Sequence, residues 1–272
     1  MLSFIKNELK QFNIELVSSL KLNECEIRKP YLLERAGIGD GSVVIFAVPY
    51  LSKKAIGERN ISSYAVSRDY HIFFDLLFEK VISNLKQIYP NNIFVGFTDH
   101  SPINEIKAAA KSGLGVVGNN HILITEKYSS YIFIGELITD AILPSFAQEI
   151  HICEECGACK SACPVGLNTS ECLSALTQKK GILNDAEKLL IVNHGCAWGC
   201  DICQQACPHT KKAIQKGSIY TDIDFFNNDL TPLLTSEIIE NMDDNEFKMR
   251  AYSWRGKDTI KRNLEFLEGK DK

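Results

Sequence analysis

The chain has 272 residues, which is enough for one large domain or two smaller ones with a proper hydrophobic core. Apolar residues make up 45% of the chain and charged residues 24%, as in ordinary soluble globular proteins. The net charge of −4 excludes a global basic field that attracts nucleic acid or membrane, although a local patch could still do so. We find neither a membrane-spanning apolar stretch nor the continuous apolar core of a signal peptide, and we expect a cytoplasmic protein.

Helix and strand patterns alternate in the first part of the chain. Ser42 to Val48 is a β-branched apolar run before Pro49 and predicts a buried strand. Asp69 to Tyr89 carries one apolar stripe and predicts a helix that Pro90 ends. The N-terminus predicts an amphipathic helix, because its apolar residues recur near helical spacing: Phe4, Ile5, Leu9, Phe12 and Leu16.

Further elements follow before the cysteine-rich part. Asn92 to Thr98 is a second strand candidate. Ser101 and Pro102 suit the N-cap and first residue of a helix that Gly113 closes. His121 to Thr125 and Tyr131 to Thr139 are expected to pair as strands.

These patterns divide the chain into three parts. Residues 1–150 are expected to form an α/β cofactor or substrate domain, within an overall α+β or α/β protein. Residues 151–212 form a ferredoxin-like cysteine module, and residues 213–272 a C-terminal helical segment that follows a polar, acidic stretch.

Nine of the ten cysteines lie in the cysteine module, and seven of them form two runs. The first is Cys153-x2-Cys156-x2-Cys159-x3-Cys163-Pro164, and the second is Cys200-x2-Cys203-x3-Cys207-Pro208. Cysteines at x2 spacing wrap one [4Fe–4S] cubane, and the cysteine before proline ligates the other cluster. Paired zinc sites also use C-x2-C pairs, but zinc needs neither the triplet nor the Cys-Pro ends. The runs therefore predict two [4Fe–4S] clusters.

The spacing assigns most of the ligands. The first cluster takes Cys153, Cys156, Cys159 and the distant Cys207. The second takes Cys163, Cys200, Cys203 and either Cys172 or Cys196, with spacing alone leaning slightly to Cys196. The remaining cysteine, Cys25, is expected to be a buried or inert thiol.

At this point the residues resemble the cobalamin-dependent epoxyqueuosine reductase family, from about Tyr64 to Asn263. The matching blocks are Tyr64-Ala65-x2-Arg68-Asp69-Tyr70-His71, Asp99-x2-Pro102, Gly113-Leu114-Gly115-x2-Gly118-x-Asn120, Phe133-x-Gly135-Glu136-Leu137-x-Thr139, Cys172-Leu173-Ser174-x-Leu176-Thr177, GCDICQQACP from Gly199 to Pro208, and the pairs Arg255-Gly256 and Arg262-Asn263. The chain departs from the family pattern at His100, Ser101, Asn119, His209 and Thr210.

The resemblance implies an oxidoreductase that reduces epoxyqueuosine to queuosine in tRNA with two clusters and a cobalamin. It favours Cys172 as the last ligand of the second cluster. It also implies that Asp99 is the general acid, for which burial would have to raise its pKa. Without the family, Asp99 is equally a capping or loop aspartate. We assign the cobalamin pocket to Tyr64, Arg68, Asp69, Tyr70, His71, Gly115, Gly118 and Asn120.

Alternative interpretations remain open in the sequence. Arg68 and Asp69 could simply pair with each other, and the glycines could serve an ordinary loop. The basic segment from Lys248 to Arg262 suits either tRNA phosphates or a solvated helix face, and Trp254 is expected in the core. The protein could reduce another small substrate with a corrinoid, or carry electrons without being an enzyme. We expect a monomer with an external flavodoxin- or ferredoxin-type electron donor, possible tRNA binding and no membrane contact.

Overall fold

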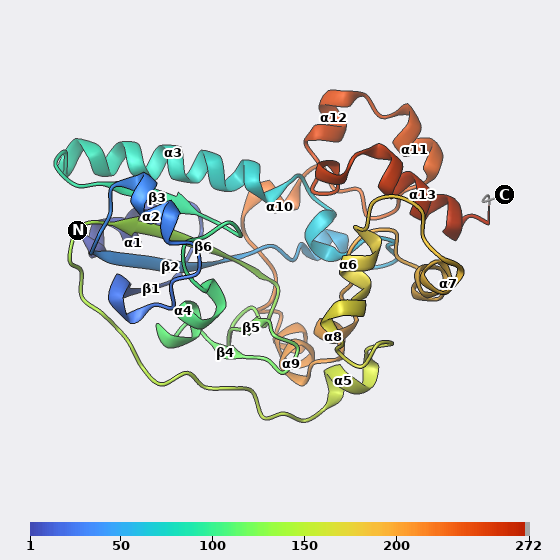
Figure 1. The fold of residues 1–272 in the computed structure, drawn as a ribbon, viewed down its shortest axis with the longest axis horizontal. Coiled ribbons are helices and arrows are strands. Elements are labelled where there is room, and N and C mark those ends of the chain that lie inside the picture. The colour runs from blue at the N-terminus through green and yellow to red at the C-terminus, as the bar shows by residue number, and fades with distance from the viewer. Residues whose placement is uncertain (270–272) are drawn as a thin grey trace.

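The computed structural model describes residues 1–269 and contains a four-stranded sheet with a helical, cysteine-rich part beside it (Figure 1). The sheet order is β1-β2-β6-β3, and every neighbouring pair is antiparallel. The strands are β1 (Leu16–Lys21), β2 (Ser42–Pro49), β3 (Phe94–Phe97) and β6 (Ile132–Thr139). The fold is therefore α+β, and the expectation of an α/β first domain is wrong.

The insertion of β6 explains this error. Strands β2 and β3 flank the long helix α3 (Tyr70–Ile88) in the chain, which is the pattern of a parallel crossover unit. They do run in the same direction, but β6 lies between them and is antiparallel to both. Only a contact between residues far apart in the sequence makes this sheet antiparallel.

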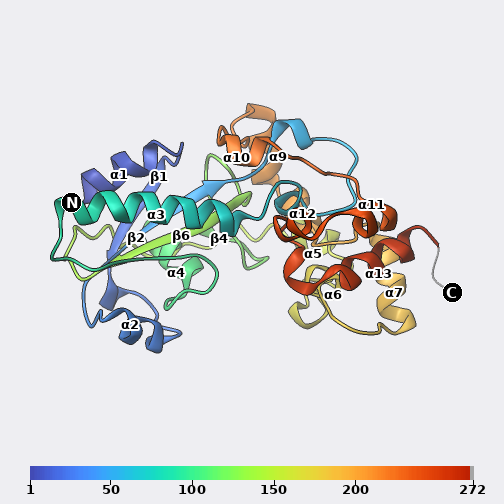
Figure 2. The same ribbon diagram turned by 90° about the horizontal axis from the view of Figure 1, so that it is seen from above.

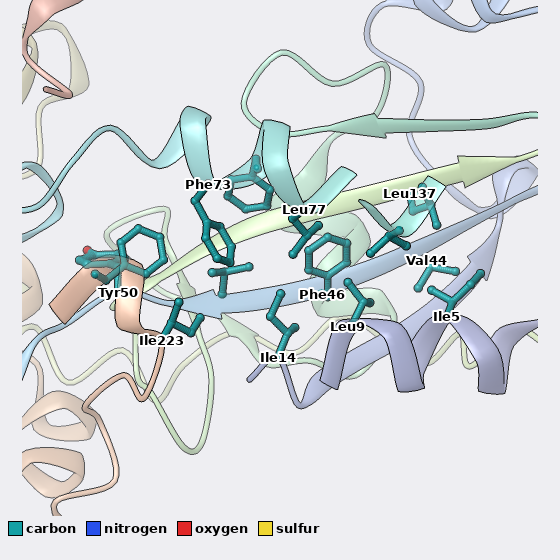
Figure 3. Packing of buried hydrophobic residues seen from close by; sticks show 14 of the residues in the cluster. Ile5, Leu9, Ile14, Val44, Phe46, Tyr50, Phe73, Leu77, Leu137 and Ile223 are labelled. Carbon is teal, nitrogen blue, oxygen red and sulfur yellow. The ribbon is translucent and has the colours of Figure 1, made fainter. Parts of the chain in front are cut away.

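Both faces of the sheet are covered by helices. Val44, Phe46 and Val48 of β2 face the helices α1 (Leu2–Lys10) and α3. Figure 3 shows Val44 and Phe46 among side chains from both helices. The alternate residues of β2 face the other way, toward α2 (Pro30–Ala36) and α4 (Glu105–Lys111). The whole strand is buried for this reason, as its apolar sequence predicts.

Two local predictions fail. The helix after β3 begins at Glu105 with Asn104 as its N-cap, whereas Ser101 hydrogen-bonds into the core instead of capping a helix. The expected pair of strands at 121–125 and 131–139 does not form. Strand β5 (Leu123–Ile124) pairs with β4 (Val116–Val117), and β6 pairs with β2 and β3, because its eight residues, seven of them buried, fill the centre of the sheet.

The rest of the chain is built from short helices. In the cysteine module they are α5 (Ala158–Ala162), α6 (Leu173–Thr177), α7 (Asp185–His194), α8 (Ile202–Ala206) and α9 (Pro208–Lys216). After it come α10 (Asp224–Asn227), α11 (Ser236–Asn241), α12 (Asp244–Lys248) and α13 (Lys257–Leu267). No helix in this described part of the chain, residues 1–269, is both long and apolar enough to cross a membrane.

The parts of the chain exchange core residues. Ile223 and Phe226, which follow the cysteine module, pack into the core beneath α3. In the other direction, Ile61 and Val66 from the first part pack with Trp198 and the C-terminal helices. Figure 2 shows the result, with α9 and α10 lying between the sheet and the C-terminal helices. The exchange fixes the cysteine module against the sheet.

Candidate functional site

Four cysteines from both runs surround one small cavity. They are Cys153, Cys156, Cys159 and Cys207. Cys207 is the N-cap of α9, and Pro208 takes the first helical position, where its missing N–H costs nothing. The main-chain N–H of Asn119 donates to the Cys153 sulfur at 3.3 Å. Two runs separated by about forty residues thus meet in one site.

A second group of four surrounds a cavity of about 310 Å³. These are Cys163, Cys172, Cys200 and Cys203. The side chain of Asn120 donates a hydrogen bond to Cys203, while its Oδ1 atom is buried with no hydrogen-bond partner among the described residues. Cys163 of the first run lies with the cysteines of the second run, and Cys207 of the second run lies with those of the first. Ferredoxin spacing predicts this exchange of the cysteines that precede proline.

The structure separates the two candidates for the last ligand. Cys172 lines the second cavity as N-cap of α6. Cys196 does not: its thiol is 9% exposed and donates to the main-chain oxygen of Trp198 at 3.3 Å. Burial raises the pKa of Cys196 to about 12, and that of the remote Cys25 to about 12 as well. Both thiols are therefore neutral at physiological pH.

A cavity of about 670 Å³ lies between the sheet and the cysteine module. Its size is within the range of ligand and cofactor sites. Aromatic rings form much of its wall, and Tyr70 stacks on Phe133 with ring centres 4.0 Å apart. Its lining residues include Tyr50, Tyr64, Asp69, Tyr70, His71, Asp99, Ser130, Phe133, Ser174, Gln178, Gln204 and Trp254.

Asp99 projects toward this cavity from the loop after β3. Its backbone is left-handed, with φ of 58°, which an aspartate tolerates better than most residues. The hydroxyl of Tyr70 donates to Asp99 Oδ2, and the imidazole of His71 lies 3.6 Å from the same oxygen. The side chain is 54% exposed, so the burial on which the expected acid role depended is absent here.

Asp69 and His71 form a pair beside Asp99. Asp69 is the N-cap of α3 and accepts from the His71 main-chain N–H at 3.0 Å. Its Oδ1 also lies 2.8 Å from Nδ1 of His71. This hydrogen bond and the charges of Asp69 and Asp99 raise the pKa of His71 against its partial burial. A proton on His71 therefore lies next to the Asp99 carboxylate.

Four of the residues assigned to the cobalamin pocket do not line this cavity. Arg68 forms an ion pair with Asp229 at 2.5 Å, and not with Asp69. A Cβ atom at Gly115 would stand 2.4 Å from the main-chain oxygen of Ile124, so this glycine permits close packing of its own hairpin. A Cβ atom at Gly118 would likewise stand too close to Asn120 and to the main-chain oxygen of Ile122. Asn120 lines both cysteine cavities instead of the large one.

The large cavity and the second cysteine cavity share a wall. Tyr64, Ile122, Ser174 and Gln204 line both. Tyr64 is fixed there by the indole N–H of Trp198, which donates to its hydroxyl at 2.8 Å. Sequence reasoning missed Ser174 and Gln204, although both belong to motif blocks that carry the resemblance. A group bound in the large cavity would therefore lie next to the second set of thiols.

Trp254 is also placed differently from the expectation. It is 57% exposed and lines the cavity, so its assignment to the core is wrong. The guanidinium of Arg255 lies 3.7 Å from its ring centre. The core position is taken by Trp198, which packs against Tyr252.

Comparisons with known proteins agree with this architecture. Epoxyqueuosine reductase from Gloeobacter violaceus is 30% identical over 220 residues, covering 77% of this chain and 69% of the relative. The chain belongs to the epoxyqueuosine reductase family. The enzyme of the same name from Lactococcus garvieae is 31% identical over 212 residues, covering 74% of this chain and 59% of the relative. No family model matches.

Solved epoxyqueuosine reductases share the fold. The structure from Streptococcus thermophilus has a TM-score of 0.79 at 22% identity and covers 99% of this chain and 81% of that one. An epoxyqueuosine reductase bound to an epoxyqueuosine-modified tRNA-Tyr stem loop has a TM-score of 0.77 at 22% identity, covering 99% of this chain and 80% of its own. The chain thus spans about 60 to 70% of the first two curated relatives and more of the solved ones.

Proposed function

We propose that this chain is an oxidoreductase that reduces epoxyqueuosine to queuosine in tRNA, using two [4Fe–4S] clusters and a cobalamin. The observation that carries the proposal is the shared wall between the Asp99 cavity and the second group of cysteines. That arrangement allows electrons and a proton to reach one substrate from opposite sides. Family membership supplies the substrate class.

The residues fit two clusters. Each cavity offers four thiol ligands, the number that one [4Fe–4S] cluster takes. The first group would be held by Cys153, Cys156, Cys159 and Cys207, and the second by Cys163, Cys172, Cys200 and Cys203.

The large cavity fits a cobalamin. Its aromatic wall offers flat apolar surface to a flat macrocycle, while Ser130 and Gln204 add polar groups to its lining. Tyr64, Tyr70 and His71 are the predicted pocket residues best placed to hold it. When bound and reduced by the clusters, a cobalamin supplies a strong nucleophile or electron donor.

The positions of the cysteine groups suggest an order for the electrons. Cys156 of the first group is exposed, so that group is accessible to an external flavodoxin- or ferredoxin-type donor. The second group adjoins the large cavity and would deliver electrons there. Removal of an epoxide oxygen as water consumes two electrons and two protons, so the conduit must act twice per turnover.

Asp99 is our candidate for proton delivery. A general acid must lie within hydrogen-bond reach of the leaving oxygen, and Asp99 lines the cavity. Tyr70 and His71 both contact its Oδ2 and orient the carboxyl group. His71, held by Asp69, can return a proton to Asp99 after each transfer. Bound cofactor and substrate would exclude the water that now reaches Asp99.

Trp254 and Arg255 are our candidates for contact with tRNA. An exposed indole at the wall of the cavity, stacked by a guanidinium, is a surface on which a nucleobase can stack. The basic segment is less available for phosphates than its sequence indicates, because Lys257 pairs with Asp244 and Lys261 with Glu240. We therefore assign recognition chiefly to stacking.

Anaerobic reconstitution with iron, sulfide and cobalamin tests the proposal. We expect about eight irons and one cobalt per chain, together with conversion of an epoxyqueuosine-modified stem loop to queuosine. Eight irons without cobalt would support the electron-carrier alternative. A bound corrinoid without conversion would point to another small substrate.

A further inference from the structure

Two carboxyl groups, one buried and one half-buried, lie behind the Asp99 loop, and the proposed reaction does not use them. Glu136, on β6, is 0% exposed, and Glu105 is the first residue of α4. Each has one carboxyl oxygen that is buried without a hydrogen-bond partner among the described residues. An ionised carboxylate in such a place leaves negative charge unsatisfied, whereas a protonated one does not.

Both carboxyl groups bind the same loop. The hydroxyl of Ser101 donates to Oε2 of Glu136 and accepts from the Ile103 main-chain N–H at 3.1 Å. Glu105 accepts a hydrogen bond from the main-chain N–H of Asp99. The main chain of Asp99, the residue proposed as the acid, thus contacts Glu105. Ser101, two residues later, contacts Glu136.

The remainder of the loop has separate supports. The main-chain oxygen of Pro102 accepts from the N–H groups of Arg28 and Lys29, at 2.7 and 3.0 Å. Asn104 donates its main-chain N–H to the oxygen of Glu26 at 2.9 Å. The part of the loop that depends on the buried carboxyls is therefore the part that carries Asp99.

We infer that Glu105 and Glu136 form a protonated carboxyl pair that positions Asp99, and that ionisation of the pair releases the Asp99 segment from its place at the cavity. The two groups are positioning residues, since neither lines the cavity. An effect of the pair on catalysis rests on the proposed function, because it requires Asp99 to be the acid. The effect of the pair on the position of the loop does not depend on that function.

The electrostatic surroundings favour protons on both groups. Burial, with a contribution from Glu105, raises the pKa of Glu136 to about 8 against the Ser101 hydrogen bond. Burial and the charge of Asp99 raise the pKa of Glu105 to about 7, opposed by the Asp99 main-chain hydrogen bond and by Lys29. The other titratable group that faces Glu136 is Cys25, which is neutral and has Glu24 and Lys111 beyond it.

Hydrogen exchange of the Asp99 and Ile103 amides tests the inference without substrate. The full-length reconstituted protein is followed by mass spectrometry between pH 6 and 8, with rates corrected for intrinsic exchange. If opening of the loop exposes Glu136, protection in the wild type falls by about tenfold per pH unit. In Glu136→Gln, which keeps an acceptor for Ser101 but cannot ionise, protection should fall less steeply with pH, because only Glu105 still ionises.

Three variants keep this test decisive. Glu79→Gln, an exposed change on α3, removes the same charge and should behave as the wild type. Glu105→Gln, in which only Glu136 still ionises, should likewise have a shallower pH dependence than the wild type and replaces Glu136→Gln if that variant folds poorly. Ser101→Ala should lose protection at every pH. Equal pH slopes in the wild type and both glutamine variants, or no slope in the wild type, would overturn the inference.

A second readout connects the loop to turnover. In Glu136→Gln, the alkaline limb of the kcat profile should move to higher pH, with KM for the stem loop unchanged. If the protein proves inactive on epoxyqueuosine, this readout disappears while the exchange result stands. Failure of the proposed function is thereby distinguished from failure of the positioning role.

Discussion

At the scale of single residues, the site depends on side chains whose roles follow from their neighbours. Asp99 is a half-exposed loop residue whose carboxylate contacts Tyr70 and His71. Cys172 and Cys196 are equally plausible ligands by chemistry, and only their positions distinguish them. Trp254 is exposed, against the expectation of a core position, whereas Trp198 is fully buried.

Asp99→Asn should retain both clusters and the corrinoid while turnover falls by about 10²- to 10⁴-fold, the usual contribution of a general acid. Single-turnover conversion of the modified stem loop measures the loss. The control is Asp222→Asn, an exposed aspartate that does not line the catalytic cavity. If Asp99→Asn turns over at the wild-type rate, the proton comes from another group.

Cys172→Ser should reduce the iron content from about eight to about four per chain, because the second cluster loses one of its four ligands. Cys196→Ser should retain the full iron content, since this thiol is bonded to the Trp198 main chain outside the cavity. Iron analysis and the visible spectrum measure both variants. The reverse result would transfer the ligand role to Cys196.

Trp254→Ala should weaken stem-loop binding by about 5- to 150-fold, the equivalent of about 1–3 kcal/mol per stacked base. Trp254→Phe keeps an aromatic face and should retain most of the affinity. Fluorescence anisotropy with a labelled stem loop gives both dissociation constants. Equal affinity of the alanine variant and the wild type would remove Trp254 from the tRNA surface.

At the scale of elements, helix α3 joins the core to the site. Its apolar stripe, which includes Phe73, Leu77 and Val81, packs on the sheet. Its first turn presents Tyr70 and His71 to the cavity, immediately after the Asp69 N-cap. Packing of the helix on β2 and β6 therefore sets the position of both side chains relative to Asp99.

Two neighbouring leucines of α3 test this packing. Leu77→Ala should lower the free energy of unfolding by about 2–5 kcal/mol, because Leu77 is fully buried beneath the helix. Leu76→Ala, at a position that is 54% exposed, should change it by less than about 0.5 kcal/mol. Denaturant titrations compare the two. A similar cost for both would mean that α3 does not present this face to the sheet.

At the scale of the whole molecule, the first part of the chain and the C-terminal helices complete one another. Ile223 and Phe226 fill the core of the sheet domain, and Ile61 and Val66 fill that of the C-terminal helices. The domain boundaries expected near residues 150 and 212 reflect changes in composition along the chain. The hydrophobic cores contain residues from both sides of these boundaries. This exchange holds the cysteine groups beside the large cavity that Asp99 lines.

The free energy of unfolding should depend on pH through the ionisation of Glu136. Its carboxyl is protonated in both states at low pH, so its contribution is fully present below about pH 4.5. Between about pH 4.5 and about 8 the unfolded chain releases the proton that the folded chain keeps, and stability falls as pH rises. Above about pH 8 the loss is complete. Glu136→Gln should lack this component, so its stability relative to wild type should rise across the interval, as measured by urea titrations at several pH values.

The sequence alone determined the features that depend on local spacing. Spacing predicts that Cys163 and Cys207 each join the other cysteine run, that β2 is buried along its length and that α3 begins after Asp69. Each of these depends on residues within a few positions or on one repeated period. Local spacing gave a wrong prediction at Ser101 and Pro102, which resemble the start of a helix. They lie in the loop before α4, where Ser101 hydrogen-bonds to Glu136.

Only the tertiary structure decided what depends on distant partners. The insertion of β6 between β2 and β3 makes the sheet antiparallel, and the position of Cys172 rather than Cys196 at the second cavity completes its group of four. The exposure of Trp254 and the burial of Glu136 behind the Asp99 loop are of the same kind. Burial decides each of these, and burial is a property of surfaces that meet in space rather than of neighbours along the chain.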